Sequence, residues 1–462
     1  MRRILPVLFF SALFLGACVP TVTLLGHVTQ PAPTAEFIAT PPPATVTRIP
    51  APTALPDLGI RPDALTGVEV LAWDGWDGSS SRLFQQMAAE FTLSNKWGIK
   101  VSVVSQRNLV LLAGQVDKAM LTEQQPDIVV ALPEQILAWQ DNVVDLSPYT
   151  VQPDIGIDPG AMNGAFWEQS HTNGKRYGLP AARSARFLFY NTSFAQDLGF
   201  NAAPGNLDQF REQACKANAF WKQDADLTND GFGGLALDVS ANWQTPFSWL
   251  AAAGAQVFVD GEFRFNTPEN VAVLDFVSKL RADGCAWPSS SSSNYDHFAA
   301  RRALFITGSL GEMAAQKQAF VAAASADQWT VLPFPGAQPT IVAYGPDYAV
   351  LKSGSARQLA AWLFIRWMLE PQNQLSWSRQ TGLFPVTASA VKLLQADGVA
   401  NPQLAAALTL IPDASIYPQT PLWRVADGPL ADGFMAYFYS FPNGTLEGVL
   451  TSLDATVKEL TK

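Results

Sequence analysis

The stretch Val68-Glu-Val-Leu-Ala-Trp-Asp-Gly-Trp-Asp-Gly-Ser-Ser-Ser-Arg-Leu-Phe84 decides the fold of this chain. Its apolar start predicts a buried strand, which the turn-forming residues 74–78 bring to an abrupt end. A helix follows, capped by a serine of 79–81, with an apolar face running from Leu83 to Phe91. Two tryptophans and two aspartates then lie at the carboxyl end of a strand, where open α/β sheets bind ligands.

Length and composition predict a globular protein with more than one core. The chain has 462 residues, which is more than a single core of about 250–300 residues holds. The net charge of −10 argues against a nucleic-acid partner, because binding phosphates requires clustered Lys and Arg. Fourteen Trp and 28 Phe favour a sugar ligand over an ion, since aromatic rings cover the apolar faces of sugars.

Residues 1–17 have the pattern of an export signal: two arginines, an apolar run too short to span a bilayer, and small residues at the end. Leu15-Gly16-Ala17-Cys18 resembles the bacterial lipoprotein signal box, which implies cleavage before Cys18 and a lipid on its sulfur. The alternative is an ordinary signal peptide with an incidental cysteine. Acyl chains anchor a protein by burying CH₂ groups at about 0.8 kcal/mol each.

Residues 18–65 predict an extended linker after the lipidated cysteine. Nine Pro and eight Thr between Val19 and Ile60, without an apolar period, cannot bury a core. Beyond the linker only Cys215 and Cys285 remain, an even pair in an oxidising compartment. They are expected to form a disulfide, and two unpaired buried thiols are the alternative.

The rest of the chain alternates strands and helices in α/β order, which predicts parallel strands joined by right-handed crossovers. Apolar runs and alternating patterns predict strands at 99–103, 126–132, 187–190, 235–237, 304–307, 329–332 and 348–351. Helices are predicted at 109–121, 207–220, 246–253, 268–283, 356–369 and 373–380.

The order of these segments resembles the extracytoplasmic solute-binding proteins of ABC importers, in particular the carbohydrate-type family that includes maltose-binding proteins. The pieces that carry the resemblance are the opening strand and Trp-Asp loop, Trp97-Gly-Ile-Lys-Val101, Pro126-Asp127-Ile128, Gly174-Lys-Arg-Tyr-Gly-Leu-Pro180, Phe187-Leu-Phe-Tyr-Asn191, Asn242-Trp-Gln-Thr-Pro-Phe247, Phe298-Ala-Ala-Arg-Arg-Ala-Leu-Phe-Ile-Thr-Gly308, Val331-Leu-Pro333 and residues 361–382. The resemblance covers residues 66–462.

The resemblance implies a two-lobed periplasmic-binding-protein-like α/β fold, with hinge segments and a ligand cleft between the lobes. Lobe 1 is expected at 66–180 plus 338–384, and lobe 2 at 181–337 plus 385–462. The chain is then expected to cross between lobes near Leu179-Pro180, near Pro335–Ala343 and near Phe384-Pro385. Binding of a ligand would close this hinge.

No catalytic or cofactor-binding motif accompanies this pattern. The three histidines, His27, His171 and His297, form no metal motif, and no G-x-S-x-G, Walker or G-x-G-x-x-G sequence is present. Asp74 and Asp77 could imitate a glycosidase pair, but holding sugar hydroxyls is the favoured role. Residues 224–231 predict a turn, because their spacing departs from a calcium loop. We therefore expect no enzyme, cofactor or metal.

The ligand site is expected to combine aromatic plates with carboxylates, hydroxyls and arginines. From the first lobe the opening loop predicts Trp73, Asp74, Trp76 and Asp77. The resemblance implies Glu134, which stands where the family has a polar ligand contact after its Pro-Asp-Ile strand. From the second lobe and the crossings the resemblance implies Arg183, Ser184, Arg186, Phe247, Ser309, Tyr344, Trp423 and Arg424. Ser184 stands where maltose binders have an acid, Phe247 where they have a tyrosine, and Leu310 removes a stacking tryptophan, so a shifted specificity is expected.

The sequence thus predicts a monomeric, lipid-anchored substrate-binding protein on the outer face of the cytoplasmic membrane, in the periplasm if an outer membrane exists. It is expected to capture a mono- or oligosaccharide and to deliver it to the permease subunits of an ABC importer. Two alternatives stay open. One is a surface-anchored hydrolase that acts on glycans, and the other is a tethered sensor or adhesin that reuses the fold.

Overall fold

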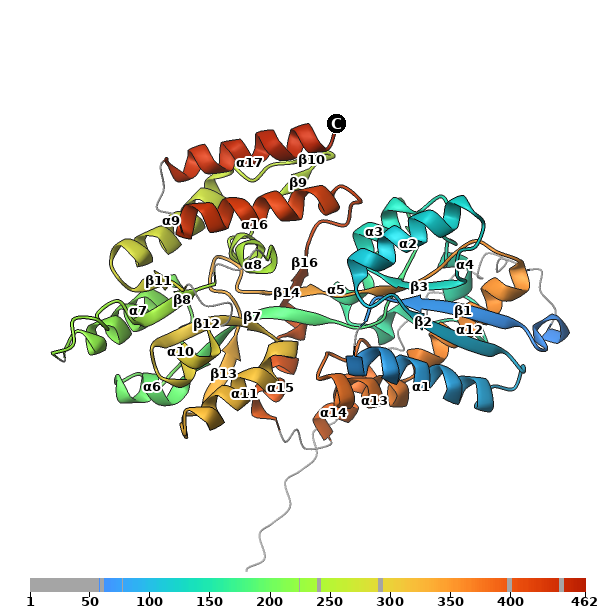
Figure 1. Ribbon diagram of the computed structural model, residues 1–462, viewed down its shortest axis with the longest axis horizontal. Helices are drawn as coiled ribbons and strands as arrows, with labels where there is room; N and C mark the ends of the chain where they lie inside the picture. Colours follow the sequence, from blue (N-terminus) through green and yellow to red (C-terminus); the bar gives the residue numbers. More distant parts are fainter. Residues whose placement is uncertain are drawn as a thin grey trace, which may run out of the picture. The chain divides into compact units, whose positions relative to one another are not determined.

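The computed structural model describes residues 58, 62–76, 78–223, 225–238, 242–289, 294–396, 401–439 and 444–462. The predicted signal peptide, Cys18, most of the linker and Asp77 lie outside the described residues. The described body contains two main sheets, and we call each sheet with its covering helices a lobe (Figure 1). Within the described residues no helix is both long and apolar enough to cross a bilayer.

The first lobe is built on a five-stranded sheet that contains the opening strand. Its strands are β1 (Glu69–Asp74), β2 (Lys100–Ser105), β3 (Ile128–Ala131), β6 (Leu179–Pro180) and β15 (Asp347–Val350). Their order is β2-β1-β3-β15-β6, with β1 parallel to β2 and β3, and with β15 antiparallel to its neighbours. The opening strand, its loop and the fully buried strand β3 therefore confirm the sequence prediction.

The alternation of side chains along β3 explains why this sheet needs helices on both faces. Ile128 and Val130 belong to the apolar group around α1 (Gly78–Ser94) and α12 (Ser355–Met368), whereas Val129 and Ala131 pack with α2 (Leu109–Leu121) and α3 (Pro133–Ala138). Successive side chains of a strand point to opposite faces, so an apolar run such as 128–131 must be covered twice. Figure 1 shows α1 across the sheet from α2 and α3.

The second lobe is built on a seven-stranded sheet around one long strand. Its strands are β7 (Ser184–Asn191), β8 (Gly233–Leu237), β11 (Ala286–Pro288), β12 (Ala303–Ser309), β13 (Trp329–Leu332), β14 (Ile341–Tyr344) and β16 (Ala414–Ile416). The order is β11-β8-β12-β7-β14-β16, and β13 also pairs with β7. One edge of β7 thus bonds to β12, while the other bonds to β13 along 188–191 and to β14 along 184–186.

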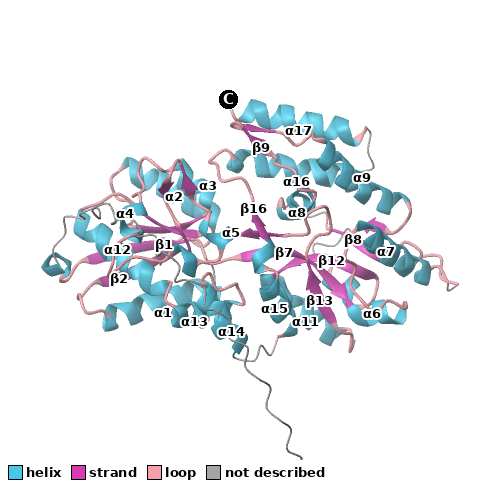
Figure 2. Ribbon diagram, turned by 180° about the vertical axis from the view of Figure 1, so that it is seen from behind, coloured by secondary structure: helices cyan, strands magenta, loops and turns pink. Residues whose placement is uncertain are grey.

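The strand β7 is buried along its whole length because both faces of this sheet are covered. Phe187 and Phe189 belong to the apolar group that includes α11 (Met313–Ala322) and α15 (Pro402–Thr409), and Leu188 and Tyr190 belong to the group that includes α7 (Leu207–Trp221) and α8 (Gln244–Ala252). Figure 2 shows α8 above this sheet and α11 and α15 below it.

The remaining elements complete the two lobes. The other helices are α4 (Ser147–Thr150), α5 (Gly164–Trp167), α6 (Thr192–Asp197), α9 (Pro268–Ala282), α10 (Tyr295–Ala299), α13 (Pro371–Thr381), α14 (Ala388–Ala396), α16 (Trp423–Tyr439) and α17 (Leu446–Leu460). Short 3₁₀ turns lie at Pro62–Leu65, Pro159–Ala161, Leu310–Glu312 and Ile411–Asp413. Two hairpins pair β4 (His171–Thr172) with β5 (Lys175–Arg176) and β9 (Phe258–Val259) with β10 (Glu262–Phe263).

One chain crossing lies elsewhere than the sequence predicted. Residues 338–344 were assigned to the first lobe, with a crossing at 335–343, but β14 pairs with β7 and β16 in the second sheet. The chain reaches the first sheet only after Gly345-Pro346, because β15 starts at Asp347. A Cβ at Gly345, whose φ is +148°, would lie 2.3 Å from the carbonyl oxygen of Ala182. Glycine therefore permits two crossing segments to touch here.

Two further boundaries differ from the sequence prediction. The opening helix α1 begins at Gly78, so Ser79–Ser81 lie in its first turn and do not precede it as caps. Ser81 Oγ instead donates a hydrogen bond to Asp74 Oδ2 over 3.2 Å. After the third crossing, α14 packs on α13, although residues 385–462 were assigned to the second lobe.

A disulfide joins Cys215 of α7 to Cys285, which directly precedes the edge strand β11. The two Cα atoms are 4.4 Å apart, and the bridge closes a sequence separation of 70 residues. Cys285 is buried, and its amide donates to the carbonyl oxygen of Leu280 at the end of α9. The predicted pairing is therefore confirmed, and it fixes the edge of the second sheet to α7.

Replacing both bridged cysteines by alanine is expected to lower the free energy of unfolding by about 4 kcal/mol, the chain-entropy value for a loop of this length. Urea denaturation of the Cys215→Ala/Cys285→Ala protein against wild type measures this difference. A reductant should lower the free energy of unfolding of wild type to about that of the variant, and it should leave the variant unchanged. Equal midpoints for both proteins in the absence of reductant would contradict a stabilising bridge.

Candidate functional site

A hydrogen bond between two buried side chains joins the lobes at the candidate site. Glu134 lies in the first turn of α3, which starts with Pro133 directly after β3, and Tyr417 follows β16 of the second lobe. The Tyr417 hydroxyl donates to Glu134 Oε2 over 2.8 Å. Both side chains are buried, so the carboxyl end of the Pro-Asp-Ile strand meets the second lobe here.

Burial changes the protonation of Glu134. Desolvation raises the pKa of Glu134 to about 7, against a lowering by its own backbone amide and by the Tyr417 hydroxyl. Asp427 of α16 adds a further rise through its charge, and Arg424 partly offsets it. Burial also raises the pKa of Asp427 itself. The site therefore holds two carboxyls that lack full compensation by a cation and that suit hydrogen-bond donors of a solute.

An aromatic cluster centred on Trp243 forms the wall beside this carboxyl. The Trp243 ring centroid lies 4.9 Å from that of Tyr417, 5.1 Å from Trp423, and 6.1 Å from both Phe247 and Tyr344. Trp243 directly precedes α8 and is half-buried. Sequence reasoning missed Trp243 and Tyr417, although Trp243 lies inside the quoted segment 242–247.

Strand register places four of the predicted residues on one face of the second sheet. Tyr344 of β14 lies opposite Ser184 of β7, and Ser309 of β12 lies opposite Arg186. Ser184 and Arg186 are two residues apart on β7 and so point to the same face. Burial raises the pKa of Tyr344, while the charge of Arg186 acts against that rise.

Arg186 is buried among acceptors of its own lobe. Its Nε donates to Thr245 Oγ1 over 2.9 Å and its Nη1 to Glu312 Oε2 over 2.8 Å. Its Nη2 donates to Thr307 Oγ1 over 2.9 Å and also pairs with Asp238. Burial alone lowers the pKa of Arg186, but Glu312 and Asp238 outweigh it and raise the pKa. In the described conformation Arg186 thus supports its own lobe, and its contact with a ligand remains a prediction.

Arg183 is also a supporting residue, since none of its side chain is exposed. Its Nη1 donates to the carbonyl oxygens of Ala182 and Pro346 over 2.9 and 2.7 Å, and its Nη2 pairs with Asp347. An isolated antiparallel β-bridge pairs the backbone of Arg183 with that of Phe384, so the third crossing segment also lies beside Arg183. In the described conformation the crossings enclose the guanidinium, and its contact with a ligand remains a prediction.

The opening loop makes its described contacts within the first lobe. Asp74 is fully buried and accepts from the Trp76 amide over 2.9 Å and from Ser81 Oγ. Desolvation raises the pKa of Asp74 to about 6, against these two hydrogen bonds. The centroid of the Trp76 ring lies 4.6 Å from that of Trp377 and 5.3 Å from that of Phe84. Trp73 is half-buried against the apolar group around α2.

Two predicted stacking residues are core residues in the structure. Trp423 has no exposed surface, and Phe247 is also buried. Their ring centroids are 5.3 Å apart, and neither ring offers an open face. The resemblance alone suggested both rings as ligand contacts, and it does not indicate how deeply a side chain is buried. Arg424, the next residue of α16, is exposed. Beside the Glu134–Tyr417 contact, the half-buried rings are those of Trp243 and Tyr344.

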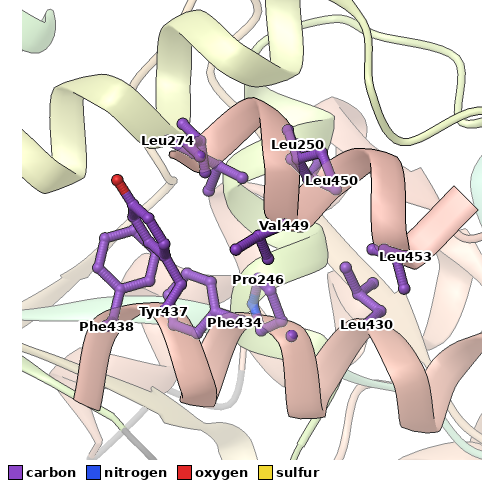
Figure 3. A pocket seen from close by; sticks show the side chains of 12 residues that line it. Pro246, Leu250, Leu274, Leu430, Phe434, Tyr437, Phe438, Val449, Leu450 and Leu453 are labelled. Atoms are coloured by element: carbon purple, nitrogen blue, oxygen red, sulfur yellow. The ribbon is translucent and has the colours of Figure 1, made fainter. Parts of the chain in front are cut away.

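One cavity lies away from these residues, between α8, α9, α16 and α17 (Figure 3). Its volume is about 20 Å³, room for roughly one water molecule. Its lining is Pro246, Leu250, Leu274, Leu430, Gly433, Phe434, Tyr437, Phe438, Leu446, Val449, Leu450 and Leu453. The apolar lining and small volume make it a packing defect and not a solute site. Across the described residues no set of three or more His, Cys, Asp or Glu side chains could hold a metal.

The family of this chain follows from a comparison with known sequences. The family model of the bacterial extracellular solute-binding proteins matches residues 86–406, which is more than half of the chain. This chain belongs to the bacterial extracellular solute-binding proteins. The match includes α3, β7, α8, β12, β14 and β15, so it covers most of the residues that build the candidate site.

Solved structures of such proteins share the fold. The sugar-binding protein MalE from Xanthomonas citri has a TM-score of 0.74 at 17% identity, over 85% of this chain and 97% of that one. The cyclic α-maltosyl-1,6-maltose binding protein from Arthrobacter globiformis has a TM-score of 0.70 at 18% identity, over 85% and 98%. UgpB from Mycobacterium tuberculosis, in complex with glycerophosphocholine, has a TM-score of 0.66 at 19% identity, over 84% and 98%. At these identities the likeness shows the fold alone.

The pH dependence of stability tests the burial of Glu134 at its hydrogen bond with Tyr417. The folded-state pKa of about 7 lies above the ordinary 4.5, so the native state retains a proton that the unfolded state loses between these values. Stability from this group is therefore present below pH 4.5 and lost as the pH rises to 7. Relative to Glu134→Gln, wild type should lose about 3 kcal/mol of unfolding free energy across that window.

Denaturant titrations at pH 4.5 and pH 8 measure this difference. The rise at Asp74 is common to both proteins and cancels. Glu447→Gln, an exposed substitution of the same type on α17, serves as the control and should track wild type. A wild-type to Glu134→Gln difference that stays constant with pH would contradict the burial argument.

Proposed function

We propose that this protein is the lipid-anchored substrate-binding component of an ABC importer, and that it captures a mono- or oligosaccharide. The observation that carries the proposal is the meeting of half-buried aromatic rings with buried acceptors at the lobe contact. Trp243 and Tyr344 offer flat apolar faces, while Glu134 and the Ser184 and Ser309 hydroxyls lie beside them. A sugar has the matching chemistry, with CH faces for the rings and hydroxyls for the polar groups.

Capture of a solute requires the two lobes to change their relative orientation about the crossing segments. The Glu134–Tyr417 hydrogen bond joins the lobes at the site, and the chain passes between them at residues 181–183, at Gly345-Pro346 and at Phe384. A solute favours one arrangement only through contacts that differ between the arrangements. Glu134 and Trp243 belong to different lobes, so a solute that touches both favours the closed arrangement.

The family and the pattern at the amino terminus support delivery to a permease. Extracellular solute-binding proteins hold solutes outside the cytoplasmic membrane, and two neighbouring structures carry names of sugar binders. Lipidation at Cys18 would hold the protein at the outer face of that membrane. The Pro/Thr-rich linker would leave the binding body free to reach the permease subunits.

Truncating Trp243 tests the sugar site. A thermal-shift screen with neutral mono- and oligosaccharides first identifies the solute, since a ligand at 100 times its Kd stabilises by about 2.7 kcal/mol. For that solute, Trp243→Ala should weaken binding at least tenfold, or about 1.4 kcal/mol, through loss of the aromatic face. Isothermal titration calorimetry measures the affinity.

Trp97→Ala is the matched control, because Trp97 is likewise half-buried but packs in the first-lobe core. It should keep the wild-type affinity. Equal affinity of Trp243→Ala and wild type would remove the aromatic wall from the site. A screen in which no sugar shifts the melting temperature would contradict the proposed function as a whole.

Replacing Cys18 by alanine tests the anchor. With lipidation, wild type should partition into the membrane fraction and incorporate an alkyne-tagged fatty acid, whereas Cys18→Ala should do neither, because the thiolate that carries the lipid is gone. Thr21→Ala, a linker substitution close by, is the control that should stay anchored. Membrane-bound, labelled Cys18→Ala protein would contradict lipidation at this residue.

A further inference from the structure

Side chains of its own lobe hold the Arg186 guanidinium. Four of its hydrogen bonds go to side chains of its own lobe: Thr245, Glu312, Thr307 and Asp238. Two of these partners are carboxylates. The guanidinium charge is therefore compensated inside the protein before any solute arrives.

The two carboxylates hold Arg186 in different ways. Asp238 Oδ2 also accepts from Asn242 Nδ2 over 3.0 Å and from the hydroxyls of Thr245 and Thr307 over 3.4 Å, so it belongs to a dense network around the start of α8. Glu312 ends the 3₁₀ turn after β12 and receives Tyr295 and Arg186 on its two oxygens, each over 2.8 Å. The Glu312 side chain is 32% exposed, against 13% for Asp238. Glu312 is the solvent-facing member.

The group formed by Arg186, Asp238 and Glu312 lies at the proposed solute surface. Tyr344 interacts electrostatically with both Arg186 and Glu312, and strand register places it opposite Ser184 on the same sheet face. A negative group that reached Tyr344 would therefore meet Glu312 before it met an uncompensated cation. Repulsion between two like charges in a partly buried site costs more than the same contact in water.

The other charges near the site act in the same direction. Glu134 and Asp427 interact through their charges at the lobe contact. Arg183 is paired with Asp347 and is fully buried, and Arg424 is exposed beside the two acids. Each buried arginine that the sequence suggested as a ligand contact thus has a carboxylate partner.

We propose that Glu312 is a specificity-determining residue: by neutralising Arg186 at the solute surface it excludes anionic solutes and restricts the site to uncharged polyhydroxy compounds. The proposal rests on the proposed sugar-binding function and names the charge class of its solute. Glu312→Gln leaves an amide at the same position and keeps an acceptor for Arg186, but it removes the negative charge. Arg186 is then compensated by Asp238 alone and can attract an anion.

Matched pairs of solutes test this selection on the wild-type protein. Suitable pairs are glucose with glucuronate, galactose with galacturonate, and trehalose with trehalose 6-phosphate, together with any neutral sugar found in the screen and its uronate. Calorimetry at low and at high salt gives both affinities. We expect wild type to bind the neutral member at least tenfold more tightly, with the gap narrowing at high salt because screening weakens the repulsion.

The same pairs are then measured with Glu312→Gln, and with Glu447→Gln as a control that changes the net charge equally on exposed α17. Glu312→Gln should raise the affinity for the anionic member at least tenfold relative to the neutral one, and Glu447→Gln should not. Wild type that binds the anionic member as tightly as the neutral one overturns the proposal, as does an unchanged ratio in a folded Glu312→Gln. Binding of no member by wild type instead overturns the proposed function.

Discussion

The buried ion pair between Arg183 and Asp347 is the contact on which the arrangement of the two lobes depends. Arg183 directly precedes the long central strand of the second sheet, and Asp347 begins the strand that returns to the first. The same guanidinium binds the carbonyl oxygens of Ala182 and Pro346, so one side chain ties two crossing segments together. Removing one partner of such a pair costs about 3–5 kcal/mol, because the other charge stays buried. The pair therefore holds these two crossing segments together.

From this fixed point the site is assembled by strand register and by helix starts. The crossing delivers Ser184 and Arg186 to one sheet face, and the pairing of β14 and β12 brings Tyr344 and Ser309 to the same face. On the first-lobe side, β3 ends at Ala131 and places Glu134 in the next turn, where Tyr417 reaches it. Polar groups thus lie on the lobe contact, while the apolar halves of the same strands form the cores.

Much of the fold was predictable from the sequence, because its signals are local. The helix at Leu109–Leu121 and the strand at Trp329–Leu332 match their predicted bounds, since Asn108 caps the helix and an apolar alternation marks the strand. The disulfide was predictable because only two cysteines remain after the signal box. The crossing at Gly345-Pro346 was misplaced, because Ile341–Tyr344 has the composition of a strand in either sheet and only its hydrogen-bond partners assign it.

The sequence by itself determined the order of elements, the family and the types of residue at the site, since periodicity, turn residues and motif order are properties of neighbouring positions. Only the tertiary structure decided which arginines and aromatic rings are available. Arg183 and Arg186 looked equally suited to a ligand, but each is neutralised by carboxylates 52 to 164 positions away in the chain. Trp423 was predicted as a stacking ring and Trp243 was not, but packing buries the first and leaves the second half-exposed. Charge compensation and depth depend on contacts distant in sequence, and these exist only after folding.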